Sequence, residues 1–174
     1  MNTAVFGTSF DNYNVMHIIF AGAVQEIPEE KRKNDMSHFF RIITRQGSAF
    51  CYFKGIESAR KARAILETMI ESVKPHLFRS GFDLIDAESV ISYGRVVKLK
   101  NSDDGKTHAF TITLDTVNEK NSQIWLSFKT EESAKKARAV LWSIIESSCG
   151  KKYNPVPEEK TETTVAECAV EVEQ

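Results

Sequence analysis

The stretch ESARKARAILETMIES at 57–72 recurs as ESAKKARAVLWSIIES at 132–147, 75 residues further along the chain. Over the wider windows 53–72 and 128–147, 13 of 20 positions are identical. In both stretches the apolar residues recur at the spacing of one helix face, as in Ala59, Ala62 and Leu66. Each stretch therefore predicts an amphipathic helix that packs its apolar face on another layer.

The similarity continues upstream of the helices. Residues 6–27 align with 78–99, and HFFRII at 38–43 aligns with HAFTIT at 108–113. The first pair of segments shares identical residues at six positions: Phe6, Phe10, Asp11, Ile19, Gly22 and Val24 meet Phe78, Phe82, Asp83, Ile91, Gly94 and Val96. The chain is thus predicted to hold two copies of one module.

Each copy is expected to form strands and then one helix. The alternation and turn residues predict strands at 13–27, 37–45 and 49–54, with counterparts at 85–100, 107–115 and 123–129. The shared Gly22 and Gly94 would mark a bulge, or a turn that divides the first stretch into two strands. We therefore predict an α+β fold: two tandem copies of an antiparallel three- or four-stranded sheet followed by one helix, related by a pseudo-twofold.

The predicted domains are a first module at 1–74, a linker at 75–77, a second module at 78–149 and a flexible acidic tail at 150–174. The last 21 residues carry six Glu and one Lys, so the preceding chain is mildly basic. Such a tail buries too little apolar area to order itself, and it could contact protein partners. A mildly basic body is compatible with nucleic-acid binding.

Composition places the chain among ordinary globular proteins, with 41% hydrophobic and 27% charged residues. No apolar run has the length of a membrane span, and the first residues lack the pattern of a signal peptide. Three cysteines without close pairing are typical of a reducing compartment. We expect a cytoplasmic location, or host cytoplasm or virion if the protein is viral, and no membrane partner.

The two faces of the predicted sheets differ. Phe40, Ile42 and Cys51, with their counterparts, would form the core under the helix. The opposite face interleaves aromatic and basic residues, which can stack bases and neutralise phosphates. The candidate nucleic-acid-binding residues are Phe39, Arg41, Arg45, Phe50, Tyr52, Lys54, Tyr93, Arg95, Trp125 and Lys129. Packing of the same face against protein is the alternative.

The helices carry basic residues in their first halves. Arg60, Lys61 and Arg63 recur as Lys135, Lys136 and Arg138. We expect a solvated face, in which Arg63 pairs with Glu67 four residues later. A phosphate-contacting stripe is the alternative.

No motif indicates catalysis, a metal site or a cofactor. None of the four histidines forms a metal-type pair at close spacing, and there is no nucleophile elbow, P-loop or dinucleotide fingerprint. Cys51 is expected in the core, and Asp11 and Asp83 in capping or turn roles. We therefore expect a protein that is not an enzyme.

Two family resemblances bear on function. The stretch GSAFCYF at 47–53 resembles the third-strand signature of RNA-recognition motifs through Gly47, Ala49, Phe50 and Phe53. No helix is predicted between the first two strands, which argues against that fold. The duplicated strands-then-helix order over 6–149 is similar to the Whirly and Pur-repeat families. That resemblance implies single-stranded DNA or RNA binding on the sheet, and no residue carries over from it.

The sequence therefore predicts a homo-oligomeric binding protein for single-stranded nucleic acid. The alternative is a structural or assembly protein, such as a virion or scaffold component, that uses the same faces to pack against other chains.

Overall fold

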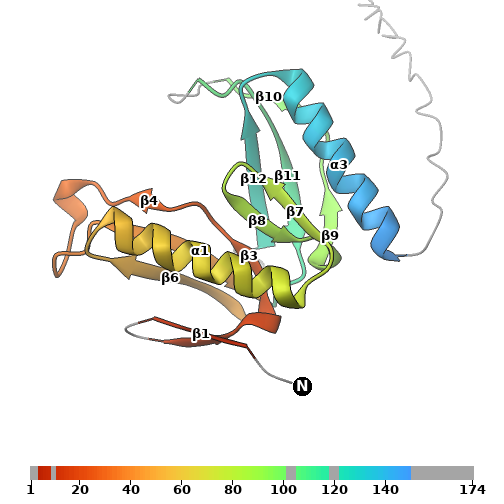
Figure 1. The fold of residues 1–174 in the computed structure, drawn as a ribbon. Helices are drawn as coiled ribbons and strands as arrows, with labels where there is room; N and C mark the ends of the chain where they lie inside the picture. The colour runs from red at the N-terminus through yellow and green to blue at the C-terminus, as the bar shows by residue number, and fades with distance from the viewer. Residues whose placement is uncertain (1–3, 9–10, 101–104, 118–121, 150–174) are drawn as a thin grey trace, which may run out of the picture.

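The computed structural model describes residues 4–8, 11–100, 105–117 and 122–149. The predicted acidic tail at 150–174 lies outside them. Within these residues, two helices and several antiparallel sheets confirm the predicted α+β class (Figure 1). The elements of the first half are β1 (Val5–Gly7), β2 (Asn12–Asn14), the 3-10 turn η1 (Val15–His17), β3 (Ile18–Ala21), β4 (Gln25–Glu26), η2 (Glu29–Lys31), β5 (His38–Thr44), β6 (Gly47–Phe53) and α1 (Ile56–Val73).

The second half contains nearly the same succession of elements. They are β7 (Leu77–Ser80), β8 (Asp83–Asp86), η3 (Ala87–Ser89), β9 (Val90–Tyr93), β10 (Val97–Lys98), β11 (His108–Leu114), β12 (Gln123–Phe128) and α3 (Glu131–Cys149). Local contacts repeat as well. Val15 N donates to Ala4 O as Ala87 N does to His76 O. Gly22 N likewise donates to Arg41 O as Gly94 N does to Thr111 O.

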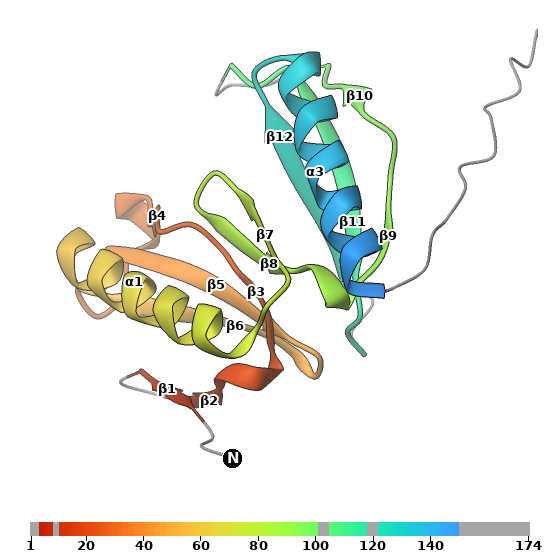
Figure 2. The same ribbon diagram turned by 45° about the vertical axis from the view of Figure 1, so that its right-hand side comes forward.

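One sheet extends across both halves. β8 pairs with β3 and with β7, so the hairpin β7–β8 completes a six-stranded sheet with β3, β4, β5 and β6. Figures 1 and 2 show this hairpin lying between the two halves. A twofold relation would also require β2 to pair with β9. Among the described residues β2 pairs with β1, and β9 pairs with β11. The predicted pseudo-twofold is therefore not found, and the two halves are arranged head to tail.

The six-stranded sheet is covered by α1 on one face and, over part of the other face, by the second half of the chain. Phe40, Ile42 and Cys51 lie under α1, as predicted, in a cluster that also contains Leu66 and Leu84. The opposite face contributes a set of apolar residues to a second cluster under α3: Ile19, Phe20, Ile43, Phe78 and Ile85. The predicted core residues of the second half, including Phe110, Ile112 and Leu126, complete that second cluster. Part of the outer sheet face is thus covered by the other half of the chain.

The first extended stretch is divided more finely than predicted. Gly22 and Gly94 do lie between two strands, which was one of the two predicted alternatives, but the chain forms β2, η1, β3 and β4 over 13–27, and the equivalent 85–100 is divided in the same way. Side chains of Asn14 and Asp86 accept from Met16 N and Glu88 N and so hold the 3-10 turns. Gly94 allows close strand approach, because an added Cβ would meet Thr111 Oγ1 at 2.8 Å. The strands β1 and β7 were missed, since three or four residues carry too little periodicity.

The predicted linker at 75–77 falls between α1 and β7, and Leu77 already belongs to β7. The sheets do not separate at this position, because β7 and β8 belong to the six-stranded sheet of the first half. Helix α3 begins after Thr130: Ser133 N donates to Thr130 Oγ1 at 3.1 Å, which caps the first turn.

Candidate nucleic-acid interface

The candidate interface begins with the pairing of β5 and β6. Their register sets Phe39 opposite Tyr52 and Arg41 opposite Phe50. Side chains alternate between the two faces of a strand, so these four residues point away from α1 while Phe40 and Cys51 point toward it. The sequence pattern therefore predicted the facing of β5 and β6 correctly.

Three aromatic rings of this face form a cluster. The centroid of Phe39 lies 5.6 Å from that of Phe50 and 6.0 Å from that of Tyr52, and the last two rings are 6.3 Å apart. Phe50 is 47% exposed and Tyr52 is 43% exposed. Large, partly exposed aromatic side chains held on a rigid sheet offer flat surfaces on which bases can stack.

A hollow of about 590 Å³ lies beside this cluster. Phe39 and Tyr52 line it from the sheet, and Lys31, Lys33 and Asn34 line it from the loop after β4. The loop is held by Arg32, whose Nε donates to Ile27 O at 3.0 Å and whose guanidinium contacts Glu26 at 2.7 Å. Two exposed lysines are thereby placed next to two aromatic rings.

The second half presents a related arrangement with different residues. Trp125, at the position that matches Phe50, is 56% exposed. It lines a hollow of about 530 Å³ together with Phe82, Lys106 and Lys129. Phe82 comes from the β7–β8 turn and is 85% exposed, so this hollow joins residues that are far apart in the sequence.

Several predicted site residues lie elsewhere. Tyr93 packs on the helix side, with its ring 6.0 Å from Trp142 and the Arg138 guanidinium 5.0 Å above it, so its predicted place among the outer aromatic residues is wrong. Arg45 pairs with Asp115 at 3.7 Å, where the second half contacts the β5–β6 turn. Arg95 and Lys54 are exposed.

Arg41 lies within the outer face between these aromatic residues. It is half-buried, and burial lowers the pKa of its guanidinium from the ordinary value. A cation with reduced contact with water interacts more strongly with an anion than a fully solvated one does. Arg41 can therefore serve both the packing of the face and the binding of a phosphate.

The residues that sequence reasoning missed are Lys31, Lys33, Phe82 and Lys106. The run KRK at 31–33 was the available signal for the first two. Phe82 could not be placed from periodicity, because it lies in a turn whose surroundings come from β12 and from Ala23, after the end of β3.

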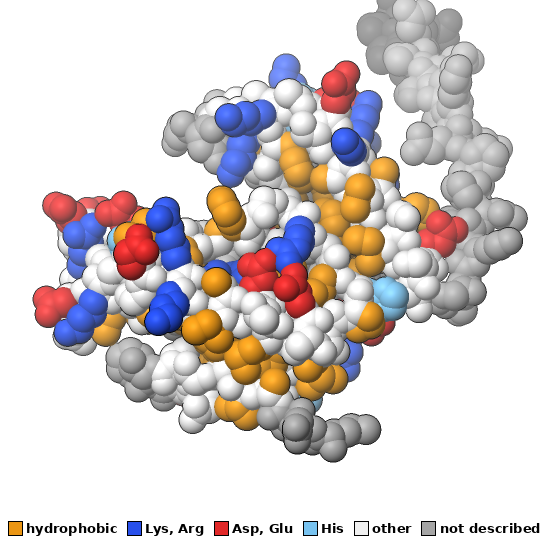
Figure 3. Space-filling model, in the orientation of Figure 1, with side chains coloured by type: hydrophobic (Ala, Val, Ile, Leu, Met, Phe, Trp, Pro, Cys, Tyr) orange, Lys and Arg blue, Asp and Glu red, His pale blue; other side chains and the backbone are white. Residues whose placement is uncertain are grey.

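The basic residues on the helices do not form a single-sign stripe. Figure 3 shows Lys and Arg side chains interspersed with Asp and Glu on the surface viewed as in Figure 1. Arg60 lies 3.8 Å from Glu57, and Arg79 pairs with Glu67 and Glu71. Arg63 does pair with Glu67, at 3.2 Å, but it is only 6% exposed, so its prediction as part of a solvated face is wrong.

The described residues contain no group of three metal-ligating side chains. His38 and His108 are the first residues of β5 and β11, and each contacts the hydroxyl of the preceding residue at 2.9 Å. Burial raises the pKa of the Cys51 thiol to about 12, which does not favour a nucleophile.

No helix within the described parts of the chain could cross a membrane. Comparisons with protein-family models, curated proteins and solved structures found no match.

Proposed function

We propose that the protein binds single-stranded nucleic acid, without catalysing a reaction, through the outer aromatic and basic faces of its sheets. The observation that carries this proposal is the ring cluster of Phe39, Phe50 and Tyr52 beside a hollow lined by Lys31 and Lys33. An unpaired base can stack on exposed rings, and ammonium groups nearby can contact its phosphate. The Whirly-like and Pur-repeat-like order of elements supports the same proposal.

The two halves would contribute unequally. The first half offers three rings and Arg41, whereas the matching positions of the second half hold Ala109, Thr111, Trp125 and Ser127. Trp125 is thus the main stacking residue of the second half, together with exposed Phe82. We expect the first half to contribute more of the affinity.

The test is a salt-series titration with labelled oligo(dT), oligo(rU) and a duplex of equal length. Replacing Phe50 and Trp125 by alanine should weaken single-strand binding by about 1–3 kcal/mol for each stacked base. Replacing Lys31 and Lys33 by alanine should reduce the slope of log affinity against log salt by about 0.7 for each phosphate that is no longer neutralised. The control is Ile65→Ala, an exposed apolar position on α1.

Binding that ignores both pairs of substitutions would remove this surface from consideration. A preference for duplex would contradict the stacking argument, because paired bases cannot lie on the rings.

An assembly role is the second candidate, and one observation favours it. Ile91, Phe82 and Val117 are 66%, 85% and 82% exposed, which leaves large apolar side chains outside any core of the chain. A structural protein would show a defined oligomeric mass and no affinity for any of the three oligonucleotides.

A further inference from the structure

The contact between the two halves is built around two neighbouring residues of β3. Ile19 is 1% exposed and Phe20 is 6% exposed, and both belong to the cluster formed mainly by the second half. The register of β3 on β5 shifts between Ile18 and Phe20. This bulge turns both side chains toward the same cluster, although neighbours in a regular strand face opposite ways.

In the second half, Ile19 and Phe20 share a cluster with residues of the hairpin β7–β8 and of the strands β11 and β12. Phe20 pairs with Ile85 across the β3–β8 ladder, and Leu114 and Ile124 belong to the same cluster. A side-chain contact accompanies the ladder, since Ala23 N donates to Asp83 Oδ1 at 2.8 Å. The halves are therefore joined by strand pairing, by apolar packing and by polar contacts that include this carboxylate.

In the described part of the chain, the equivalent strand of the second half, β9, has no such partner. β9 has the equivalent register shift, opposite Thr113 and Leu114 of β11. Ile91, which matches Ile19, is 66% exposed, and Ser92, which matches Phe20, is also exposed. No strand within the described ranges pairs with the other edge of β9. The isoleucine at this repeat position is thus buried in the first half, as Ile19, and exposed in the second half, as Ile91.

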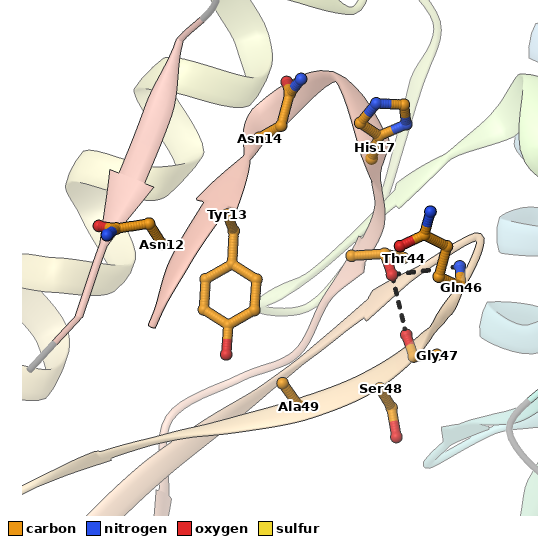
Figure 4. Close-up of a pocket in the computed structure, with 9 residues that line it drawn as sticks. All are labelled: Asn12, Tyr13, Asn14, His17, Thr44, Gln46, Gly47, Ser48 and Ala49. Atoms are coloured by element: carbon orange, nitrogen blue, oxygen red, sulfur yellow. Dashed lines mark hydrogen bonds between the residues drawn. The ribbon is translucent and has the colours of Figure 1, made fainter. Parts of the chain in front are cut away.

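The complementary surface is present at the other end of the molecule. β2 matches β8, and within the described residues it pairs only with β1. Beside it lies a hollow of about 370 Å³, lined by Tyr13, Thr44 and Ala49 among others (Figure 4). These three match Ile85, Leu114 and Ile124, which pack with Ile19 and Phe20 in the second half. The hollow is therefore the repeat equivalent of a site that β3 fills within the chain.

We propose that the open edge of β9 docks on β2 of a second copy of this chain and repeats the intramolecular β3–β8 contact. Ser92 of one copy then lies opposite Tyr13 of the next, and Ile91 enters the hollow beside β2. Asp11 of the second copy accepts from the backbone N–H of Arg95, as Asp83 accepts from Ala23. The two contacting surfaces differ, so the association is head-to-tail.

The composition of the two surfaces indicates a weaker contact than the one inside the chain. Tyr13, Thr44 and Ser92 stand where the intramolecular contact has Ile85, Leu114 and Phe20. Less apolar area is buried as a result, so the association should be reversible and depend on concentration.

Disulfide trapping tests the geometry. In a background with Cys149 and Cys168 replaced by serine, a Ser92→Cys protein is mixed with a Tyr13→Cys protein and oxidised with diamide. Directly opposed residues of an antiparallel pair satisfy disulfide geometry, so the mixture should give one linked dimer. Asn12→Cys in place of Tyr13→Cys is the matched control, because it is one residue out of register and should link far less.

A monomer in the Ser92→Cys and Tyr13→Cys mixture would overturn the proposal. Linkage of the Ser92→Cys protein to itself would do the same, because it indicates a symmetric contact between two β9 edges.

Sedimentation of the full chain supplies a second, independent measurement. The mean mass should rise with concentration, and Ile91→Lys should weaken the association about tenfold or more, since it removes an anchoring side chain and places a charge in the contact. Ile65→Lys, at a 49% exposed position on α1, should leave it unchanged. A monomer mass at every concentration, or equal effects of the two variants, would refute the contact.

Discussion

Arg63 and Arg138 occupy the same position of the repeated helix, and the structure predicts very different effects of replacing them. Arg63 donates to three backbone carbonyls, Gly22 O at 2.9 Å, Ala21 O at 3.0 Å and Phe82 O at 2.9 Å. It therefore ties α1 to the end of β3 and to the β7–β8 turn. Burial lowers the pKa of this guanidinium, and the Glu67 carboxylate opposes that effect.

Arg138 has a smaller set of contacts. Its Nε donates to Gly94 O at 2.9 Å, and its guanidinium lies 5.0 Å above the Tyr93 ring. A hydrogen bond to a charged group contributes about 1.5 kcal/mol at the low end, and an exposed cation–π contact contributes about 0.5–1 kcal/mol. Methionine preserves much of the packing of the alkyl stem. We expect Arg63→Met to cost about 4–5 kcal/mol and Arg138→Met about 2 kcal/mol.

Urea unfolding at neutral pH measures the two free energies of unfolding. The two variants should differ in midpoint by an amount equivalent to about 2–3 kcal/mol, with the slope unchanged if unfolding remains two-state. Equal losses within about 0.5 kcal/mol would refute the argument that the β7–β8 turn is held by Arg63. Arg63→Lys should recover only part of the loss, because an ammonium cannot reach three carbonyls in the same fork geometry.

Two further predictions concern packing. Gly94→Ala should lower the free energy of unfolding by about 1–2 kcal/mol, because its Cβ meets Thr111 Oγ1 at 2.8 Å, and adding Thr111→Ala should restore most of the loss in thermal or urea unfolding. Cys51 should resist Ellman's reagent in the folded protein, because burial raises the pKa of its thiol to about 12. With Cys149 and Cys168 replaced by serine, one thiol should react in urea and none without it, and rapid reaction of the native protein would contradict the burial.

The spacing of apolar residues in the sequence was sufficient to predict which side chains lie between sheet and helix. Alternation in β5 and β6 and the helical spacing in α1 identified the residues under the helix, such as Phe40, Ile42 and Leu66. It also placed Phe39, Phe50 and Tyr52 on one outer face. These assignments depend on periods of two and of 3.6 residues within single elements, which are local properties of the chain.

The candidate site was only partly predictable. Lys31, Lys33, Phe82 and Lys106 come from loops and turns, where side-chain direction follows from backbone geometry and not from a period. Tyr93 was assigned to the wrong face because the chain departs from a regular strand around Gly94.

By itself, the sequence determined the α+β class and identified the residues that lie under each helix, such as Phe40 under α1 and Phe110 under α3. Only the tertiary structure decided that the hairpin β7–β8 joins the sheet of the first half. It also decided that Ile19 is buried while the identical Ile91 is exposed. The physical reason is that pairing between distant strands depends on which edges remain open after the local elements have formed. Ile19 and Ile91 therefore differ in environment because, among the described residues, a second hairpin lies beside Ile19 and none lies beside Ile91.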